Sequence, residues 1–172
     1  MGGNFTAVRL GVGQFGPGIE GDFNFGRHFA LDGAYSWLPT GSTHAMTGLF
    51  GAKVGTRTQH FGFFGKVRPG FISFGNTLRA ETINFAPGPA LPIVSFRFGR
   101  LTERALDLGG VMEYYPARHW ALRWDMGDTL LFRERGTPSI TIIGLPIVPP
   151  SLPFSSGITS NFQFSTGVHY RF

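Results

Sequence analysis

The sequence predicts an all-β fold, an eight-stranded antiparallel transmembrane β-barrel built as an up-and-down meander, with residues 1–172 forming a single domain. Only 15% of the residues are charged, against about 25% in soluble domains. The chain contains 26 glycines and 19 phenylalanines, but no run of about 20 apolar residues that could cross a bilayer as a helix. Because backbone polar groups must be hydrogen-bonded inside a bilayer, a closed barrel is the remaining way to cross it.

Four segments in the first third of the chain alternate with period two, as half-buried strands do. Segment 6–12 sets valine and leucine against alanine, arginine and glycine, and segment 19–25 sets isoleucine and phenylalanine against acidic residues and asparagine. Segment 29–37 places aromatic residues and leucine opposite alanine, aspartate and serine. Segment 50–57 places phenylalanine, alanine and valine opposite glycine, lysine and arginine. Each segment therefore has one apolar face and one small or charged face.

Four further segments repeat the pattern to the end of the chain. Segment 61–71 sets phenylalanine and valine against lysine and arginine, and segment 106–114 sets leucine, methionine and tyrosine against aspartate, glycine and glutamate. Segment 120–126 alternates tryptophan, leucine and methionine with alanine, arginine and aspartate. Segment 162–172 alternates aromatic residues, threonine and valine with polar residues and glycine. The count of eight segments predicts the strand number.

The connections between these segments alternate in length. Tight turns are expected near residues 26–28, 59–60 and 116–118, and long loops at about 38–46, 75–104 and 134–160. Outer-membrane barrels have short periplasmic turns and longer external loops. The alternation therefore predicts a multi-pass β-barrel in the outer membrane, with both termini on the periplasmic side. No signal peptide precedes Asn4, so we expect Met1, Gly2 and Gly3 to begin a mature or recombinant form.

The charged residues indicate which face points inward. A soluble lipocalin-type barrel would turn its apolar face inward to hold a ligand. A narrow membrane barrel instead needs small residues and paired ions inside, because an unpaired buried charge is costly. The polar face carries seven cations and six anions, which predicts a lumen charge network of Arg9, Glu20, Asp22, Asp32, Lys53, Arg57, Lys66, Arg68, Asp107, Glu113, Arg123, Asp125 and Arg171.

The run from Asn161 to Phe172 resembles the terminal strand of outer-membrane β-barrel proteins, which end in an aromatic residue preceded by alternating apolar residues. The turns that contain Arg-His, followed by Phe-Ala-Leu or Trp-Ala-Leu, are similar to the OmpA-type membrane domain, a porin-like family of small barrels. The resemblance implies recognition by the barrel assembly machinery through Phe164, Val168, Tyr170 and Phe172. We expect no periplasmic peptidoglycan-binding domain of the kind found in full OmpA, and hence no anchoring role through one.

Motifs for chemistry are sparse. The glycine pattern at 11–16 matches the dinucleotide-binding spacing, but proline and glycine follow it where that motif needs a helix. Ser42 and His44 share a loop, yet no matching carboxylate completes a hydrolase triad. No spacing of His, Asp or Glu suggests a metal site, and no cofactor is expected. The basic residues are scattered singly, which argues against a nucleic-acid partner despite the net charge of +5.

The function that follows is a non-enzymatic scaffold for surface interaction or envelope integrity, with a narrow solute channel and a lipid-modifying enzyme as alternatives. The expected partners are outer-membrane lipid and lipopolysaccharide, whose phosphates would meet Arg79, Arg97, Arg100, Arg104, Arg133 and Arg135. The long loops are apolar enough to predict either a lid over the barrel or a docking surface for a protein or a second copy. The residues expected there are Phe85, Ile93, Phe96, Ile143, Ile147 and Val148.

Overall fold

The computed structural model describes residues 2–10, 12–39, 44–84, 93–133, 139–143 and 157–171, with side chains described for 13–39, 44–76, 99–133 and 157–171. Nine strands account for most of these residues. They are β1 Gly2–Leu10, β2 Val12–Asn24, β3 Phe29–Leu38, β4 Ala45–Arg57, β5 Phe61–Asn84, β6 Ile93–Ala117, β7 Trp120–Arg133, β8 Ser139–Ile143 and β9 Gly157–Tyr170. No helix long and apolar enough to cross a membrane occurs among the described residues.

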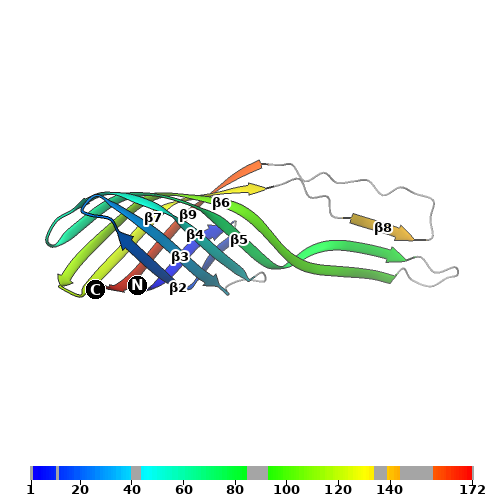
Figure 1. Ribbon diagram of the computed structural model, residues 1–172. Helices are drawn as coiled ribbons and strands as arrows, with labels where there is room; N and C mark the ends of the chain where they lie inside the picture. The colour runs from blue at the N-terminus through cyan, green and yellow to red at the C-terminus, as the bar shows by residue number, and fades with distance from the viewer. Residues whose placement is uncertain are drawn as a thin grey trace.

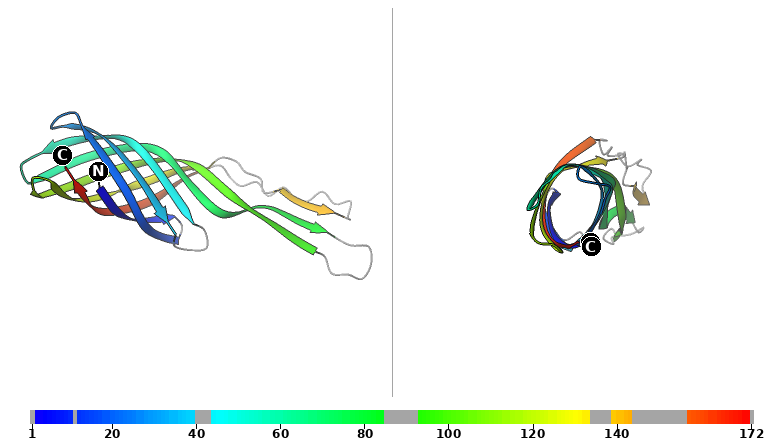
Figure 2. Two further views of the ribbon diagram at one scale, coloured as in Figure 1. Left: turned by 60° about the horizontal axis from the view of Figure 1, so that its bottom comes forward. Right: turned by 60° about the vertical axis from the view of Figure 1, so that its left-hand side comes forward.

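Eight of the nine strands close into a barrel. Neighbours along the chain pair antiparallel, β1 pairs with β9, and β4 pairs with β5, so the sheet has no open side apart from its extension. Figure 2 shows the closed ring in the view along its axis, and Figure 1 shows both termini at the end that carries the tight turns. The predicted eight-stranded meander is confirmed. We call the end with the termini the turn end and the opposite end the loop end.

Backbone hydrogen bonds tie the three tight turns to neighbouring strands. The carbonyl groups of His28, His60 and His119 accept from the backbone N–H groups of Gly55, Tyr115 and Arg171. The rings of His28 and His119 also contact the carbonyl oxygens of Gly55 and Arg171, at 2.9 and 3.1 Å. The recurring histidine therefore anchors two of the turns through its side chain as well as its backbone.

Strands β5 and β6 continue far past the barrel, which corrects the expected loop at 75–104. They contain 24 and 25 residues, whereas about 9–11 cross a bilayer. Their antiparallel pairing runs on to Asn84 and Ile93, and β8 adds to β5 in parallel. Figure 1 shows this extension projecting beyond the loop end. Residues 75–84 and 93–104 are thus strand, as their β-branched content favours.

An irregularity marks the start of the extension. The β5–β6 register shifts between Phe74 and Thr77 and again before Ala80, and Asn76 adopts a φ of 53°. Positive φ is uncommon outside glycine, although asparagine tolerates it better than most residues. Such bulges bend a strand and increase its twist. The bulge therefore separates the closed barrel from the extension.

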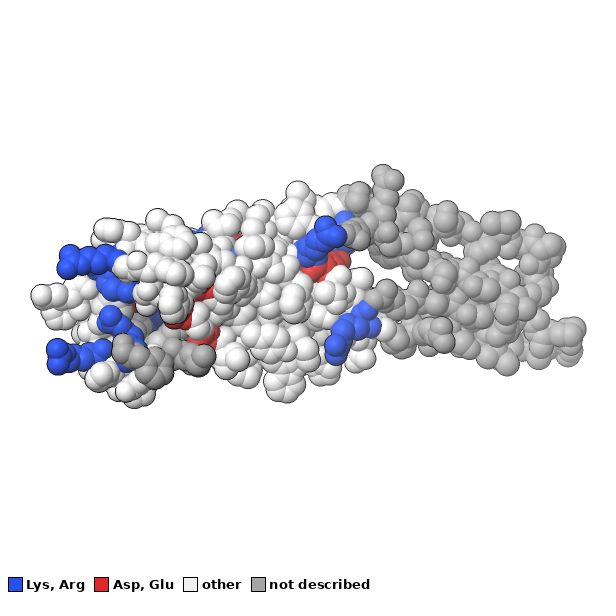
Figure 3. Space-filling view, viewed as in Figure 1, with Lys and Arg blue, Asp and Glu red and all other residues white. Residues whose placement is uncertain are grey.

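The barrel is inside out compared with a soluble protein. Its buried positions hold many charged and polar side chains, whereas its outer face exposes large apolar ones. Trp37, Phe50 and Phe63, for example, are about half exposed (47%, 61% and 53%). Figure 3 shows that, on the face in view, Lys and Arg gather at the two ends of the described barrel and the surface between them is mostly uncharged. A soluble protein would not expose such a belt, so this face contacts lipid.

The apolar core lies inside the barrel, toward the loop end. Its members are Leu38, Ala45, Leu49, Ile72, Ala105 and Leu131, with Phe74 packed against them. On most strands these residues lie farther from the turn end than the buried charged residues, as Leu38 and Asp32 do on β3, whereas on β6 the buried Glu103 lies beyond Ala105. This cluster, which we call the apolar stopper, closes the lumen above the charges.

Candidate functional site

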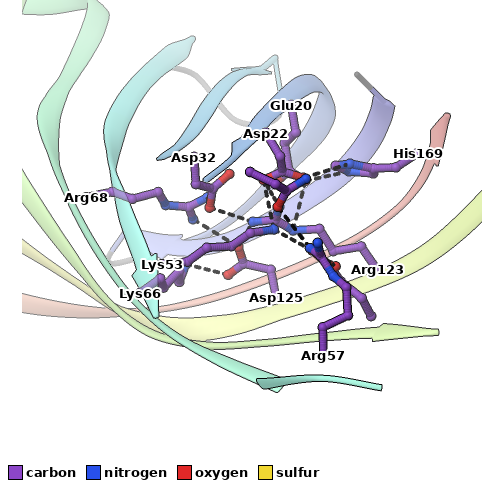
Figure 4. Close-up of polar contacts among 12 residues, drawn as sticks. Glu20, Asp22, Asp32, Lys53, Arg57, Lys66, Arg68, Arg123, Asp125 and His169 are labelled. Carbon is purple, nitrogen blue, oxygen red and sulfur yellow. Dashed lines mark hydrogen bonds and ion pairs between the residues drawn. The ribbon is translucent and has the colours of Figure 1, made fainter. Parts of the chain in front are cut away.

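Arg123 lies at the centre of the lumen and contacts four carboxylates. It projects from β7, whose alternation buries residues 121, 123 and 125 on one face. Its guanidinium contacts Asp32 at 2.7 Å, Asp22 at 3.0 Å, Asp125 at 3.1 Å and Glu20 at 3.3 Å. Since these carboxylates come from β2, β3 and β7, one side chain links opposite walls of the barrel. Figure 4 shows this convergence.

Arg68 and Lys66 form a second group on β5. The Arg68 guanidinium contacts Asp107 at 2.5 Å and both Asp32 and Asp125 at 3.1 Å. The Lys66 ammonium donates to Asp107 at 2.6 Å and also pairs with Asp125. Arg68, Asp32, Asp107 and Asp125 are each 0% exposed, so no water-sized molecule touches this layer.

A third group lies nearer the turn end. Lys53 pairs with Asp22 at 2.9 Å and with Glu113. Arg57 reaches the same Glu113 at 3.4 Å and donates through Nε to the Tyr115 hydroxyl at 2.7 Å. That hydroxyl donates in turn to Glu113 at 2.5 Å. The third group therefore joins β4 to β6 across the lumen.

His169 belongs to the network, although the sequence pattern did not assign it there. Its Nε2 lies 3.0 Å from Glu20 and its Nδ1 lies 3.4 Å from Asp22. Six carboxylates face five Lys and Arg side chains in the three groups described above. A protonated imidazole donates from both ring nitrogens, and in that form His169 would make the positive charges six. Its position on the polar face of the last strand was the available signal.

The other side chains that the sequence pattern missed are Tyr115 and Glu103. Both are buried, at 4% and 6% exposure, and Glu103 accepts from Arg133 Nε at 3.3 Å near the loop end. Tyr115 has the parity of the lumen face on β6, beside Glu113, which was predicted. An aromatic residue on a polar face was the signal that could have found it.

One predicted network residue, Arg171, lies apart from the three groups, and for another, Arg9, no side chain is described. Arg171 stacks on the Tyr115 ring, with its guanidinium carbon 4.3 Å from the ring centroid, at the turn end. Arg9 lies on β1, where only the backbone is described, and it pairs there with Gly13. Its place in the lumen network stays a prediction. The polar and apolar contrast along β1 is weak, and pairing with β2 and β9 decides its register.

Neutral polar side chains fill the space between the network and the apolar stopper. Thr129 donates to Gln163 at 2.8 Å, and Asn161 donates to the carbonyl of Thr129 at 3.2 Å. All three side chains are buried, and they come from β7 and β9. The lumen thus contains, in order from the turn end, paired ions, neutral polar groups and apolar side chains. This arrangement fills the bore rather than lining it.

A cavity of about 480 Å³ opens below the network at the turn end. Asn24, Arg57, His169 and Arg171 are among the residues around it. Since it ends where Arg123 and Glu113 are buried, it does not continue as a passage through the network. Among the described residues, no group of three or more His, Cys, Asp or Glu side chains is arranged to hold a metal ion.

The remaining predicted residues fall on the outer face, the extension or outside the described part. Val168 and Tyr170 are exposed to the lipid side at 45% and 41%, and Phe164 shares their face. Ile93 and Phe96 lie in β6 and Ile143 in β8, where only the backbone is described. Six of the residues named from the sequence lie outside the described part of the chain: Ser42, Phe85, Arg135, Ile147, Val148 and Phe172.

Comparison with known proteins identifies the fold. No protein-family model matches the sequence, and no curated protein does. The solved structure of Neisserial surface protein A is similar over 99% of this chain and 95% of that one, with 13% identity and a TM-score of 0.64. Ail, the attachment invasion locus protein of Yersinia pestis, is similar over 99% and 94%, with 10% identity and a TM-score of 0.51. The chain has the fold of small outer-membrane β-barrels, as the resemblance to OmpA-type domains implied. With its lipid-facing belt, this fold places the chain in the outer membrane as a multi-pass barrel.

Proposed function

We propose that this chain is a non-enzymatic outer-membrane scaffold that presents the β5–β6–β8 extension at the cell surface. The observation that carries the proposal is a filled barrel bearing a strand extension well beyond the membrane. Because the bore is closed, the extension does not serve transport through the barrel. Interaction with a surface partner, or with neighbouring envelope components, is the use that such a projection supports.

A narrow solute channel is the second candidate, and the lumen argues against it. A permeating ion would have to displace both the salt-bridged layer and the apolar stopper, whose members Leu38 and Ala45 are 0% exposed. In planar bilayers we expect no steady conductance from the unmodified protein. A steady, large conductance would contradict the closed lumen and favour the channel.

Arginines near the loop end support lipopolysaccharide as a lipid partner. Arg100, Arg104 and Arg133 are exposed where the barrel passes into the extension, and Figure 3 shows cationic side chains gathered there. Guanidinium groups bind phosphate in bidentate geometry. Exchanging Arg100 and Arg104 for glutamine should weaken association with lipopolysaccharide vesicles, whereas Arg27→Gln at the turn end should not. Equal binding by all three proteins would leave these arginines as a solvated surface.

The apolar residues of the extension and the last loop support a docking role, with a second copy or another protein as the partner. The test replaces Ile143, Ile147 and Val148 with serine and measures mass in detergent together with thermal melting. Loss of an associated species with an unchanged melting temperature would support docking. A monomeric parent whose barrel is destabilised by the change would instead favour a lid.

The terminal strand supports recognition by the barrel assembly machinery during insertion. Phe164, Val168 and Tyr170 form one outward face of β9, which closes the barrel against β1. Exchanging Val168 and Tyr170 for serine should lower insertion into the outer membrane in cells more than refolding into detergent. Equal loss in both assays would assign these residues to barrel stability alone.

A further inference from the structure

Two facing glycines open a groove on the lipid-facing surface. Gly65 on β5 pairs with Gly110 on β6, and the same row continues to Val54 on β4 and Met126 on β7. The groove is a shallow, open hollow of about 540 Å³ on the outer face of the barrel. Its walls include Val54, Thr56, Phe63, Met112, Trp124 and Met126.

Packing of the barrel does not require either glycine. A Cβ at Gly65 would meet only the Val54 carbonyl oxygen at 3.8 Å, and one at Gly110 only the Phe64 carbonyl oxygen at 3.7 Å. Gly109, the neighbour on the same strand, differs because its Cβ would lie 2.2 Å from the Met126 carbonyl oxygen. Glycine also weakens a strand interior, so a pair of glycines with free space suggests close approach by another molecule.

The groove lies in the half of the membrane nearer the turn end. Gly65 is four residues from Phe61, where β5 begins, which corresponds to about 13 Å along the strand. One half of the hydrocarbon core is about 15 Å thick. Since short turns face the periplasm in such barrels, an acyl chain of the periplasmic leaflet has the length to reach the groove.

The turn end carries charge that complements an anionic headgroup. Arg27 and Arg118 are exposed on two of its turns, and none of the described turn residues 25–28, 58–60 and 116–119 is acidic. The carboxylates of the described strands nearest this end, Asp22 and Glu113, point into the lumen and are paired there. Figure 3 shows the cationic side chains at this end. Basic residues at a membrane surface attract anionic lipids.

We propose that the Gly65–Gly110 groove binds one acyl chain of an anionic phospholipid from the periplasmic leaflet, with its phosphate at the basic turn end. The wall chemistry fits a flexible hydrocarbon chain, because Met112 and Met126 adapt to irregular shapes and Trp124 offers a broad apolar face. The proposed lipid site depends on the outer-membrane placement but not on the role of the extension. Either proposal can therefore be contradicted while the other stands.

The test measures lipid retained by the purified protein in detergent by native mass spectrometry after incubation with phosphatidylglycerol. The unmodified protein should keep one phosphatidylglycerol molecule. The double variant Gly65→Leu and Gly110→Leu fills the groove and should lower that occupancy about tenfold. Gly13→Leu is the matched control, because Gly13 is also exposed on a strand and a Cβ there meets nothing within 4 Å. Thermal melting should show all proteins folded.

The headgroup part is tested by Arg118→Gln, which should lower the preference for phosphatidylglycerol over phosphatidylethanolamine. Equal lipid retention by the unmodified protein and the groove-filled variant would overturn the proposal and indicate ordinary surrounding lipid. Equal retention of lipid A would overturn the assignment to the periplasmic leaflet. Loss of a dimer, rather than of lipid, in the double variant would identify a second copy as the occupant instead.

Discussion

At the scale of single residues, the lumen is held by ions that share partners. Arg123 contacts four carboxylates, and Asp125 in turn contacts Lys66, Arg68 and Arg123. Burying these groups costs desolvation energy that only mutual pairing offsets. Removing one ion therefore destabilises the barrel chiefly because its partners stay buried without a counter-ion.

Neutralising Arg123 alone should destabilise the barrel more than neutralising Arg123 and Asp125 together. Arg123→Gln leaves carboxylates without their cation and should cost about 3–5 kcal/mol in the free energy of unfolding, whereas adding Asp125→Asn should recover part of that loss. Urea unfolding in detergent measures both.

Arg133→Gln is the control for that series. Its side chain is 49% exposed and contacts only Glu103 in an ion pair that the structure describes, so its effect should stay below about 1 kcal/mol. A double variant less stable than Arg123→Gln would show that the pair adds net stability, contrary to the expectation.

At the scale of elements, β5 and β6 each contribute to both the barrel and the extension. Their turn-end halves, up to Phe74 and from Leu101, complete the barrel by pairing with β4 and β7. Their outer halves pair with each other, and β5 also with β8, beyond the bulge at Asn76. Strands β5 and β6 thus pair with each other in both halves, but in the described part of the chain only their turn-end halves pair with β4 and β7.

Removing the extension should leave the barrel folded. A variant in which a two-residue turn replaces residues 78–98 keeps the β4–β5 and β6–β7 ladders, so its melting temperature should stay within about 2–4 °C of the parent, the shift expected for about 1 kcal/mol in a chain of this size. Thermal melting in detergent and the shift in gel mobility on heating measure this. A variant that fails to refold would show that the extension is part of the folding unit.

At the scale of the whole molecule, the distribution of polarity is reversed. The interior is charged and polar on one side of the apolar stopper, and the exterior exposes aromatic and aliphatic side chains around the barrel. Because water gives no favourable contact to that exterior, the bilayer is the solvent that stabilises this fold.

The folded protein should therefore require detergent or lipid. Refolding into detergent micelles should give a β-rich circular dichroism spectrum and one species in sedimentation, whereas dilution into plain buffer should give aggregates. The same chain refolded as a monodisperse species in plain buffer would contradict the lipid-facing assignment of residues such as Phe50 and Trp120.

The sequence by itself determined the fold class, the strand count and most of the lumen face. Period-two alternation is a local property, so Asp32, Arg68 and Arg123 could be assigned to one face of their strands without knowing their neighbours. The near balance of positive and negative charges on that face then indicated that the face points into the lumen. The alternation also gave the turns, because glycine, proline and Arg-His steps interrupt it.

Only the tertiary structure decided the features that depend on pairing between strands. The extension follows from the pairing of β5 with β6 and β8. The place of His169 between Glu20 and Asp22 joins residues 149 positions apart in the chain. The Gly65–Gly110 groove likewise requires two strands side by side. A period along one strand carries no information about which residue lies beside it on the next strand, and closure of the barrel supplies that information.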